Sequence, residues 1–127
     1  MALRFAAEST QVLDGLCLLA PYLGSRIIAA EVGAHANLAD WTPPAVLEDD
    51  DDERRIWRFV QQLPRMHPAP RLFLGYGRED RFADTQRLLA RSLPPAATHE
   101  VAGGHDWSAW RTLWDEFLDT LALDTPA

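Results

Sequence analysis

Apolar and polar residues along this chain divide it into short apolar strands separated by helical segments. The predicted strands cover 12–20, 71–76 and 98–101. The predicted helices cover 1–11, a segment after Asp52, 82–93 and a last segment from Trp107 onwards. Because strands alternate with helices, the sequence predicts an α/β fold with a parallel sheet of about three strands and flanking helices.

The segment between the first two strands has weaker order than the rest of the chain. It contains most of the prolines and an acidic run over 48–53, which is typical of a solvated helix start. Ile56, Trp57, Val60 and Leu63 then recur at helical spacing, so one amphipathic helix is expected here. We therefore interpret 1–127 as one partial domain, with 25–68 as an excursion from the sheet and 69–127 carrying the candidate chemistry.

The last predicted helix carries an apolar stripe with alternating spacings of three and four residues. Its members are Trp107, Trp110, Trp114, Phe117 and Leu121. Aromatic rows at this spacing are typical of a helix that docks on a sheet, so the whole stripe is expected to be core.

Charge and composition exclude several classes of function. The formal net charge is -7, and all 12 basic residues are arginine, which disfavours nucleic acid and lysine-dependent chemistry. No segment has the length of a transmembrane helix or the form of a signal peptide, so a cytoplasmic protein with no membrane partner is expected. The single cysteine, Cys17, lies in an apolar run and is expected to be a small buried side chain.

Two side chains with catalytic chemistry follow consecutive predicted strands. Asp80 follows the strand over 71–76, and His105 follows the strand over 98–101 after Gly103-Gly104. Functional groups of open parallel sheets collect at the carboxyl ends of strands, so both side chains are expected on one edge. There a carboxylate can accept the imidazole Nδ1 proton and fix its tautomer. The alternatives are a helix cap for Asp80 and an exposed turn position for His105.

The surrounding residues resemble a known family. Leu74-Gly75-Tyr76-Gly77-Arg78-Glu79-Asp80 is similar to the acid-bearing strand and turn of the α/β-hydrolases. Gly103-Gly104-His105-Asp106-Trp107-Ser108-Ala109-Trp110 is similar to the histidine loop of their esterase-type members. The opening Met1-Ala2-Leu3-Arg4-Phe5-Ala6-Ala7 resembles the helix after the nucleophile elbow. The resemblance implies the C-terminal half of an α/β-hydrolase fold, with Asp80 as the triad acid and His105 as the general base.

The nucleophile of that family is missing from the pattern. None of Ser9, Ser25, Ser92 and Ser108 lies in G-x-S-x-G, although Ser25 follows a glycine and is kept as a displaced alternative. The resemblance places the elbow and the oxyanion-hole loop upstream of Met1.

Two functions therefore stay open at this point. One is the C-terminal part of a serine hydrolase acting on carboxylic esters or related acyl compounds, inactive alone. The other is a non-catalytic half-hydrolase that binds a partner chain or pairs with itself. No cofactor and no metal is expected, because His35, His67 and His99 share no ligand spacing.

The first strand carries a prediction about assembly. If its neighbour in the complete fold is missing, the strand over 12–20 presents unpaired backbone groups and no charge between Gly15 and Ala20. Self-association or pairing with another chain through this edge is therefore expected.

Overall fold

The computed structural model describes residues 2–8 and 13–124, which form two compact units. The helical unit comprises 1–16 and 21–71, and the sheet unit comprises 17–20 and 72–127. The two units are described separately below.

The strands form one open, all-parallel sheet in the order β1-β2-β3. They are β1 (Gly15–Leu19), β2 (Arg71–Gly77) and β3 (Thr98–Val101). The predicted α/β class and the three strands are confirmed. Strand β1 is shorter than predicted, and Val12 lies outside the described residues.

Strand register aligns the carboxyl ends of β2 and β3. Leu74 pairs with Thr98 and Gly77 with Val101, so both strands end at the same level of the sheet. On the other side of β2, the amide of Ala20 donates to Gly75 O at 2.8 Å. Loops that follow β2 and β3 therefore start from neighbouring points.

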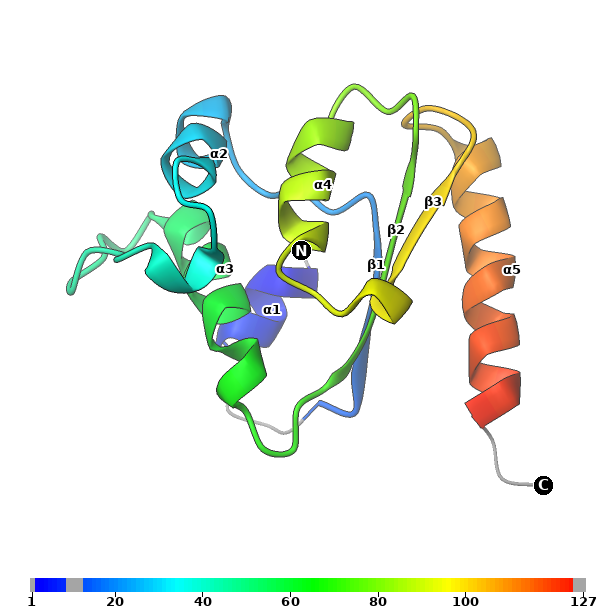
Figure 1. The fold of residues 1–127 in the computed structure, drawn as a ribbon, viewed down its shortest axis with the longest axis horizontal. Coiled ribbons are helices and arrows are strands. Elements are labelled where there is room, and N and C mark those ends of the chain that lie inside the picture. Colours follow the sequence, from blue (N-terminus) through cyan, green and yellow to red (C-terminus); the bar gives the residue numbers. More distant parts are fainter. Residues whose placement is uncertain (1, 9–12, 125–127) are drawn as a thin grey trace. The chain divides into compact units, whose positions relative to one another are not determined.

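Within the sheet unit, α4 (Ala83–Ala90) and α5 (Trp107–Asp124) lie on opposite faces of the strands (Figure 1). A short 3-10 helix, η3 (Pro95–Ala97), leads into β3. Helix α5 approaches closely because β2 has glycine at position 75, where an added Cβ would lie 2.6 Å from a Leu113 methyl carbon. The core of this unit is apolar and includes Phe73, Leu74, Tyr76, Leu89, Leu93, Ala109 and Leu113.

The helical unit is built around α3 (Asp52–Gln62), on which α1 (Ala2–Glu8) and α2 (Arg26–Gly33) pack. Two 3-10 helices, η1 (Leu38–Asp40) and η2 (Leu63–Arg65), complete it. The apolar face of α3 buries Ile56, Trp57, Phe59 and Val60. Trp57 is fully buried, and its Nε1 donates to Leu23 O at 2.8 Å, which satisfies the one polar atom of the ring.

The predicted helix after Asp52 is confirmed, and its start has a clear cause. The Asp51 carboxylate accepts from the Arg54 amide at 3.1 Å, and acids occupy the first turn, where the helix dipole favours them. Helix α2 was not predicted, although Ser25 caps its start. The predicted first helix ends at Glu8 in the described part of the chain, since 9–12 lie outside it.

The prediction that the whole aromatic stripe of α5 is core was wrong. Trp107, Trp114 and Leu121 are 70%, 47% and 39% exposed. The helix docks through Ala109 and Leu113 instead, which lie about 120° and 80° around the helix from the centre of the stripe at 100° per residue. Ala109 on the helix and Gly75 on β2 are small and allow the close approach, and Trp107, Trp114 and Leu121 are left exposed to solvent.

Candidate active site

Asp80 lies in the turn that leaves β2, with its side chain fully buried. Its amide donates to Gly77 O at 3.1 Å, which closes the turn. Its Oδ1 accepts from the Phe82 amide at 2.8 Å. A buried carboxylate needs hydrogen-bond donors, and this amide supplies one of them.

His105 supplies the second donor from the loop between β3 and α5. Its Nδ1 lies 2.8 Å from Asp80 Oδ2, so the two side chains predicted to meet are in contact. An ionised carboxylate only accepts, so Nδ1 carries the proton and the Nε2 of a neutral ring is left as an acceptor. The imidazole is 33% exposed, whereas the Asp80 side chain is 0% exposed. The arrangement is that of a base oriented from behind by a buried acid.

Aromatic rings enclose the imidazole. Phe82 and Trp110 meet it edge-on, with ring centroids 5.5 and 5.0 Å from that of His105. Trp110 Nε1 is buried and has no hydrogen-bond partner among the described residues. The Arg81 guanidinium lies over the Phe82 ring, 4.8 Å from its centroid. These contacts restrict the orientation of the imidazole to the one that faces Asp80.

The two loops that carry the acid and the histidine are locked together. Gly103 O accepts from the Glu79 amide at 2.9 Å, and the Gly103 amide donates to Glu79 Oε2 at 2.6 Å. Gly77 must be glycine, because an added Cβ would lie 2.2 Å from Gly103 O. Gly103 itself has φ of +124°, which an L side chain rarely adopts. The separation of Asp80 and His105 is thus set by backbone contacts.

Asp106 fixes the exit of the histidine loop. Its Oδ1 accepts from the Ala109 amide at 3.1 Å, and its Oδ2 accepts from the Gly104 amide at 3.2 Å. The carboxylate therefore caps the first turn of α5 and closes the loop around His105 at once.

A charged cluster joins β2, β3 and α4 beneath the two loops. Tyr76 Oη donates to Glu100 at 2.9 Å, and Arg78 and Arg87 contact the same carboxylate at 3.2 and 3.3 Å. Burial and the Glu100 carboxylate raise the pKa of Tyr76 to about 12. Burial disfavours the charged form of Glu100, but the donors Tyr76 and Arg87 outweigh it and lower the pKa of that carboxyl. The cluster links β2 and β3 to α4, and it includes neither Asp80 nor His105.

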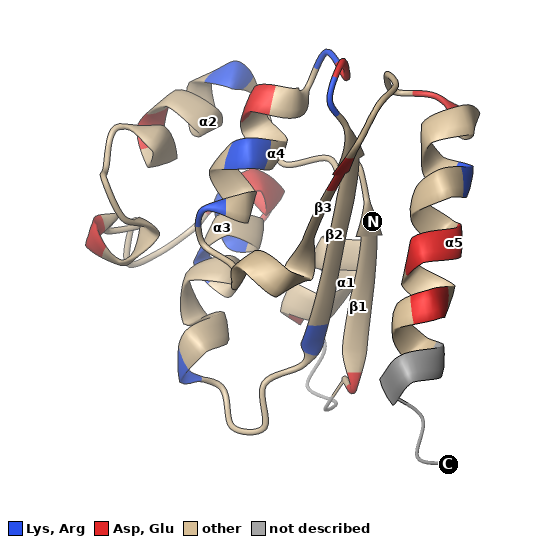
Figure 2. Cartoon of the chain, turned by 45° about the vertical axis from the view of Figure 1, so that its right-hand side comes forward, with Lys and Arg blue, Asp and Glu red and all other residues tan. Residues whose placement is uncertain are grey.

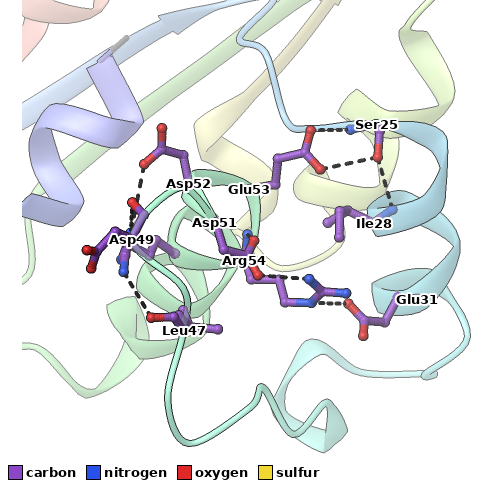
Figure 3. Close-up of polar contacts among 10 residues, drawn as sticks. Ser25, Ile28, Glu31, Leu47, Asp49, Asp51, Asp52, Glu53 and Arg54 are labelled. Carbon is purple, nitrogen blue, oxygen red and sulfur yellow. Dashed lines mark hydrogen bonds and ion pairs between the residues drawn. The ribbon is translucent and has the colours of Figure 1, made fainter.

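The kept alternative nucleophile, Ser25, has a structural partner set. Its Oγ donates to Glu53 Oε2 at 3.2 Å and accepts from the Ile28 amide at 3.5 Å, so it caps α2 and ties it to α3 (Figure 3). In the sheet unit, neither Ser92 nor Ser108 makes a hydrogen bond to His105. Within the described residues of that unit, no serine hydroxyl is hydrogen-bonded to Asp80 or His105.

The other histidines show no ligand geometry. His99 stacks on Phe73 with centroids 4.2 Å apart, and its Nδ1 lies 3.3 Å from Glu116, which gives it a packing role. In the described part of the chain, no three His, Cys, Asp or Glu side chains come together as a metal site. None of the described helices is long and apolar enough to cross a membrane.

Phe82 is the residue of this site that sequence reasoning missed. It supplies both an amide to Asp80 and a ring to His105. The signal was its position two residues after an aspartate that follows a strand, where an Asx-type turn brings the amide back to the carboxylate.

Comparisons with protein-family models, curated proteins and solved structures gave no match for this chain.

Proposed function

We propose that this chain is the C-terminal part of a serine hydrolase acting on carboxylic esters or related acyl compounds. Asp80 would be its acid and His105 its general base. The observation that carries the proposal is the 2.8 Å contact between a fully buried carboxylate and an imidazole with one open ring nitrogen. A helix cap alone would not need an imidazole partner, so this contact favours the catalytic role of Asp80.

The proposed reaction proceeds by acyl transfer. His105 Nε2 takes the proton of a serine hydroxyl as its oxygen bonds to the acyl carbon, and the imidazolium is stabilised by Asp80. The same proton then passes to the leaving alcohol as its bond to the acyl carbon breaks. Water repeats the two steps on the acyl-enzyme and releases the acid. His105 is thus base and acid in turn, while its Nδ1 proton stays on the ring and donates to the Asp80 carboxylate throughout.

The nucleophile and the oxyanion donors of this reaction would come from outside 1–127. We therefore expect the 127-residue chain to show no esterase turnover above background and no labelling by a fluorophosphonate probe. Turnover of an aryl ester by this chain that is lost in Ser25→Ala would refute the assignment of Ser25 as a helix cap.

The decisive experiment extends the chain with the coding sequence upstream of Met1. If an in-frame G-x-S-x-G is present there, the extended protein should react with a fluorophosphonate, and His105→Gln should abolish the labelling. His99→Gln is the matched control, because that histidine packs against Phe73 and should leave labelling unchanged. The proposal would be ruled out if the extended protein is never labelled, or if its His105→Gln variant is labelled equally well.

A second test needs no nucleophile. In the 127-residue chain, ¹⁵N chemical shifts of His105 should report the Nδ1–H tautomer in the neutral ring, and Asp80→Asn should shift the population towards Nε2–H. Asp84→Asn is the control, since that carboxylate is fully exposed on α4. An unchanged tautomer in Asp80→Asn would show that Asp80 does not orient the ring.

The second candidate function is a non-catalytic module that pairs with itself or with another chain. The observation that favours it is the position of β1, which is the outermost strand in the order β1-β2-β3. Among the described residues no further strand pairs with it, so its outer backbone groups can accept a partner.

A further inference from the structure

The outer edge of β1 carries backbone groups of known direction. Asp14 O and Ala20 N both bond to β2, at 2.9 and 2.8 Å. Backbone groups of a strand alternate in direction, so the even-numbered residues face β2 and Cys17 and Leu19 direct theirs outward. The same two bonds align Cys17 beside Phe73 and Leu19 beside Gly75.

The side chains of Cys17 and Leu19 lie on the face of the sheet that α5 covers. Their neighbours on β2 show this, since Phe73 contacts Phe117 with centroids 5.3 Å apart and Gly75 lies against Leu113. Cys17 and Leu19 are only half-buried, although they are apolar. Helix α5 therefore covers this face of the sheet only partly along β1.

The orientation of α5 shows which of its flanks overhangs β1. Relative to Leu113, Glu116 is turned about 60° one way and reaches His99 of β3, whereas Phe117 is turned about 40° the other way and reaches Phe73 of β2. The flank on the Phe117 side therefore faces β1.

That flank is apolar and exposed. Trp114, Leu118 and Leu121 lie about 80° to 140° from Leu113 on the Phe117 side, and they are 47%, 43% and 39% exposed. We call these three residues, with Cys17 and Leu19, the β1 flank surface. It combines an open strand edge with large apolar side chains beside it, which marks an interaction surface.

Charge is distributed so that this surface suits another copy of the same chain. The net charge of -7 makes most approaches between copies repulsive. On α5, Glu116 and Asp119 are turned about 60° and 120° from Leu113 towards the β3 side, and Asp115 is turned about 160° and faces away from the sheet. Strand β1 carries no charged residue from Gly15 to Leu19 (Figure 2). The residues of the β1 flank surface are thus uncharged, so two copies meet there with less repulsion than at the charged parts of the chain.

We propose that two copies of this chain dock through the β1 flank surface, with their β1 strands antiparallel about a two-fold axis perpendicular to the sheet. One rotation places both α5 helices on the same face, so Trp114, Leu118 and Leu121 of each copy meet those of the other. The three-stranded sheets join into one of six strands. Such an interface is isologous and closes at two copies. The proposal specifies the self-association that the second candidate function requires, and it does not depend on catalysis.

The test is sedimentation velocity of the 127-residue chain over about 1 to 100 µM, a range in which weak dimers dissociate. The chain should sediment as a monomer and dimer in exchange. Leu118→Arg should raise the dimer dissociation constant at least about tenfold, because two buried charges are introduced per dimer. Thr112→Arg is the matched control: it adds the same charge to an exposed position of α5 on the opposite flank, and should change the constant less than about twofold.

Cross-linking through the single thiol locates the interface independently. Cys17 is the central outward residue of β1, so the axis brings the two thiols together, and a short bismaleimide should yield covalent dimers. The reaction is run at about pH 8.5, because burial raises the pKa of the Cys17 thiol. Leu118→Arg should lose the cross-link at equal protein concentration, whereas Thr112→Arg should keep it.

The possible outcomes distinguish the specific dimer from the broader proposal that the chain pairs with itself. A monomer at every concentration overturns both the dimer and the self-pairing function. A dimer that Leu118→Arg and Thr112→Arg weaken equally, or that does not cross-link through Cys17, overturns the β1 flank surface but leaves self-pairing standing. Open-ended aggregation, in place of a dimer, overturns the two-fold arrangement. Circular dichroism of each variant confirms that it is folded.

Discussion

Glu53 of the helical unit and Asp80 of the sheet unit show two opposite uses of a carboxylate. In the helical unit, Glu53 binds Ser25, and Arg54 lies between Asp51 and Glu31, all at partly exposed positions (Figure 3). Glu53 also accepts from Tyr22. In the sheet unit, the side chain of Asp80 is fully buried, and His105 is the one ionisable side chain among the described residues that contacts its carboxylate. The first pattern ties segments together in water, where each contact is weak. The second buries a carboxylate away from water, which costs free energy unless specific hydrogen bonds compensate for it.

The largest expected effect breaks the buried pair. In the complete enzyme of the proposed function, Asp80→Asn should lower kcat by about 10⁴, because the imidazole loses the group that fixes its tautomer. Glu53→Gln removes a charge from the helical unit and should leave kcat within about twofold, since that carboxylate is exposed. Steady-state kinetics on both variants measure the contrast, and equal losses would show that the buried pair is not special.

The next largest effect concerns the backbone that holds the pair. Gly77→Ala should destabilise the chain by about 3 kcal/mol, since the new Cβ meets Gly103 O and forces the two loops apart. Gly24→Ala, at φ of +98° in the helical unit, should cost about 1 kcal/mol. Urea unfolding gives both values, and a Gly77→Ala protein as stable as the parent would contradict the interlocked loops.

Alkaline pH distinguishes the two tyrosines. The pKa of Tyr76 is raised to about 12, so the folded chain holds its proton between about pH 10 and 12 while the unfolded chain releases it. The resulting stability, about 2 to 3 kcal/mol, is fully present below pH 10 and is lost as pH rises towards 12. Tyr76→Phe should remove this loss. Tyr22→Phe should have a much smaller effect: its hydrogen bond to Glu53 also raises the pKa of Tyr22, but Tyr22 is 64% exposed, so water weakens the interaction. Chemical unfolding across pH 9 to about 12 measures the slope.

The smallest effect is expected at the exposed clamps. Arg54→Gln breaks contacts with Asp51 and Glu31 but leaves both carboxylates near water, so it should cost no more than about 1 kcal/mol. The difference should shrink in about 1 M salt, which screens exposed charges. A larger loss of stability that does not depend on salt would show that Arg54 and its two carboxylates behave like the buried Asp80–His105 pair.

The strands and the acid–histidine contact could be predicted because both depend on local pattern. Strands β1 and β2 are apolar runs that end near Pro21 and Gly77, and β3 lies between the breaks at Pro94-Pro95 and Gly103-Gly104. Strand order then brings Asp80 and His105 to one edge. Helix α2 was missed because its two buried residues, Ile28 and Val32, are too few to mark a face.

The exposed side of the α5 stripe and the contact between the rings of Phe82 and His105 could not be assigned from pattern for a different reason. Periodicity shows that Trp107, Trp114 and Leu121 share a side of a helix, but not that Gly75 on another element draws Leu113 towards the sheet and turns that side outward. The role of Phe82 depends on a turn whose direction is set by contacts between Glu79 and Gly103. Both are consequences of tertiary contacts.

The edge-on contact between Trp110 and His105 gives the site an optical signal of its own. The indole centroid is 5.0 Å from that of the imidazole, at an interplanar angle of 89°. A protonated imidazole quenches the emission of an adjacent indole, whereas a neutral one does so much less. Fluorescence of Trp110, with the other tryptophans replaced by phenylalanine, would therefore report the charge on His105 in solution.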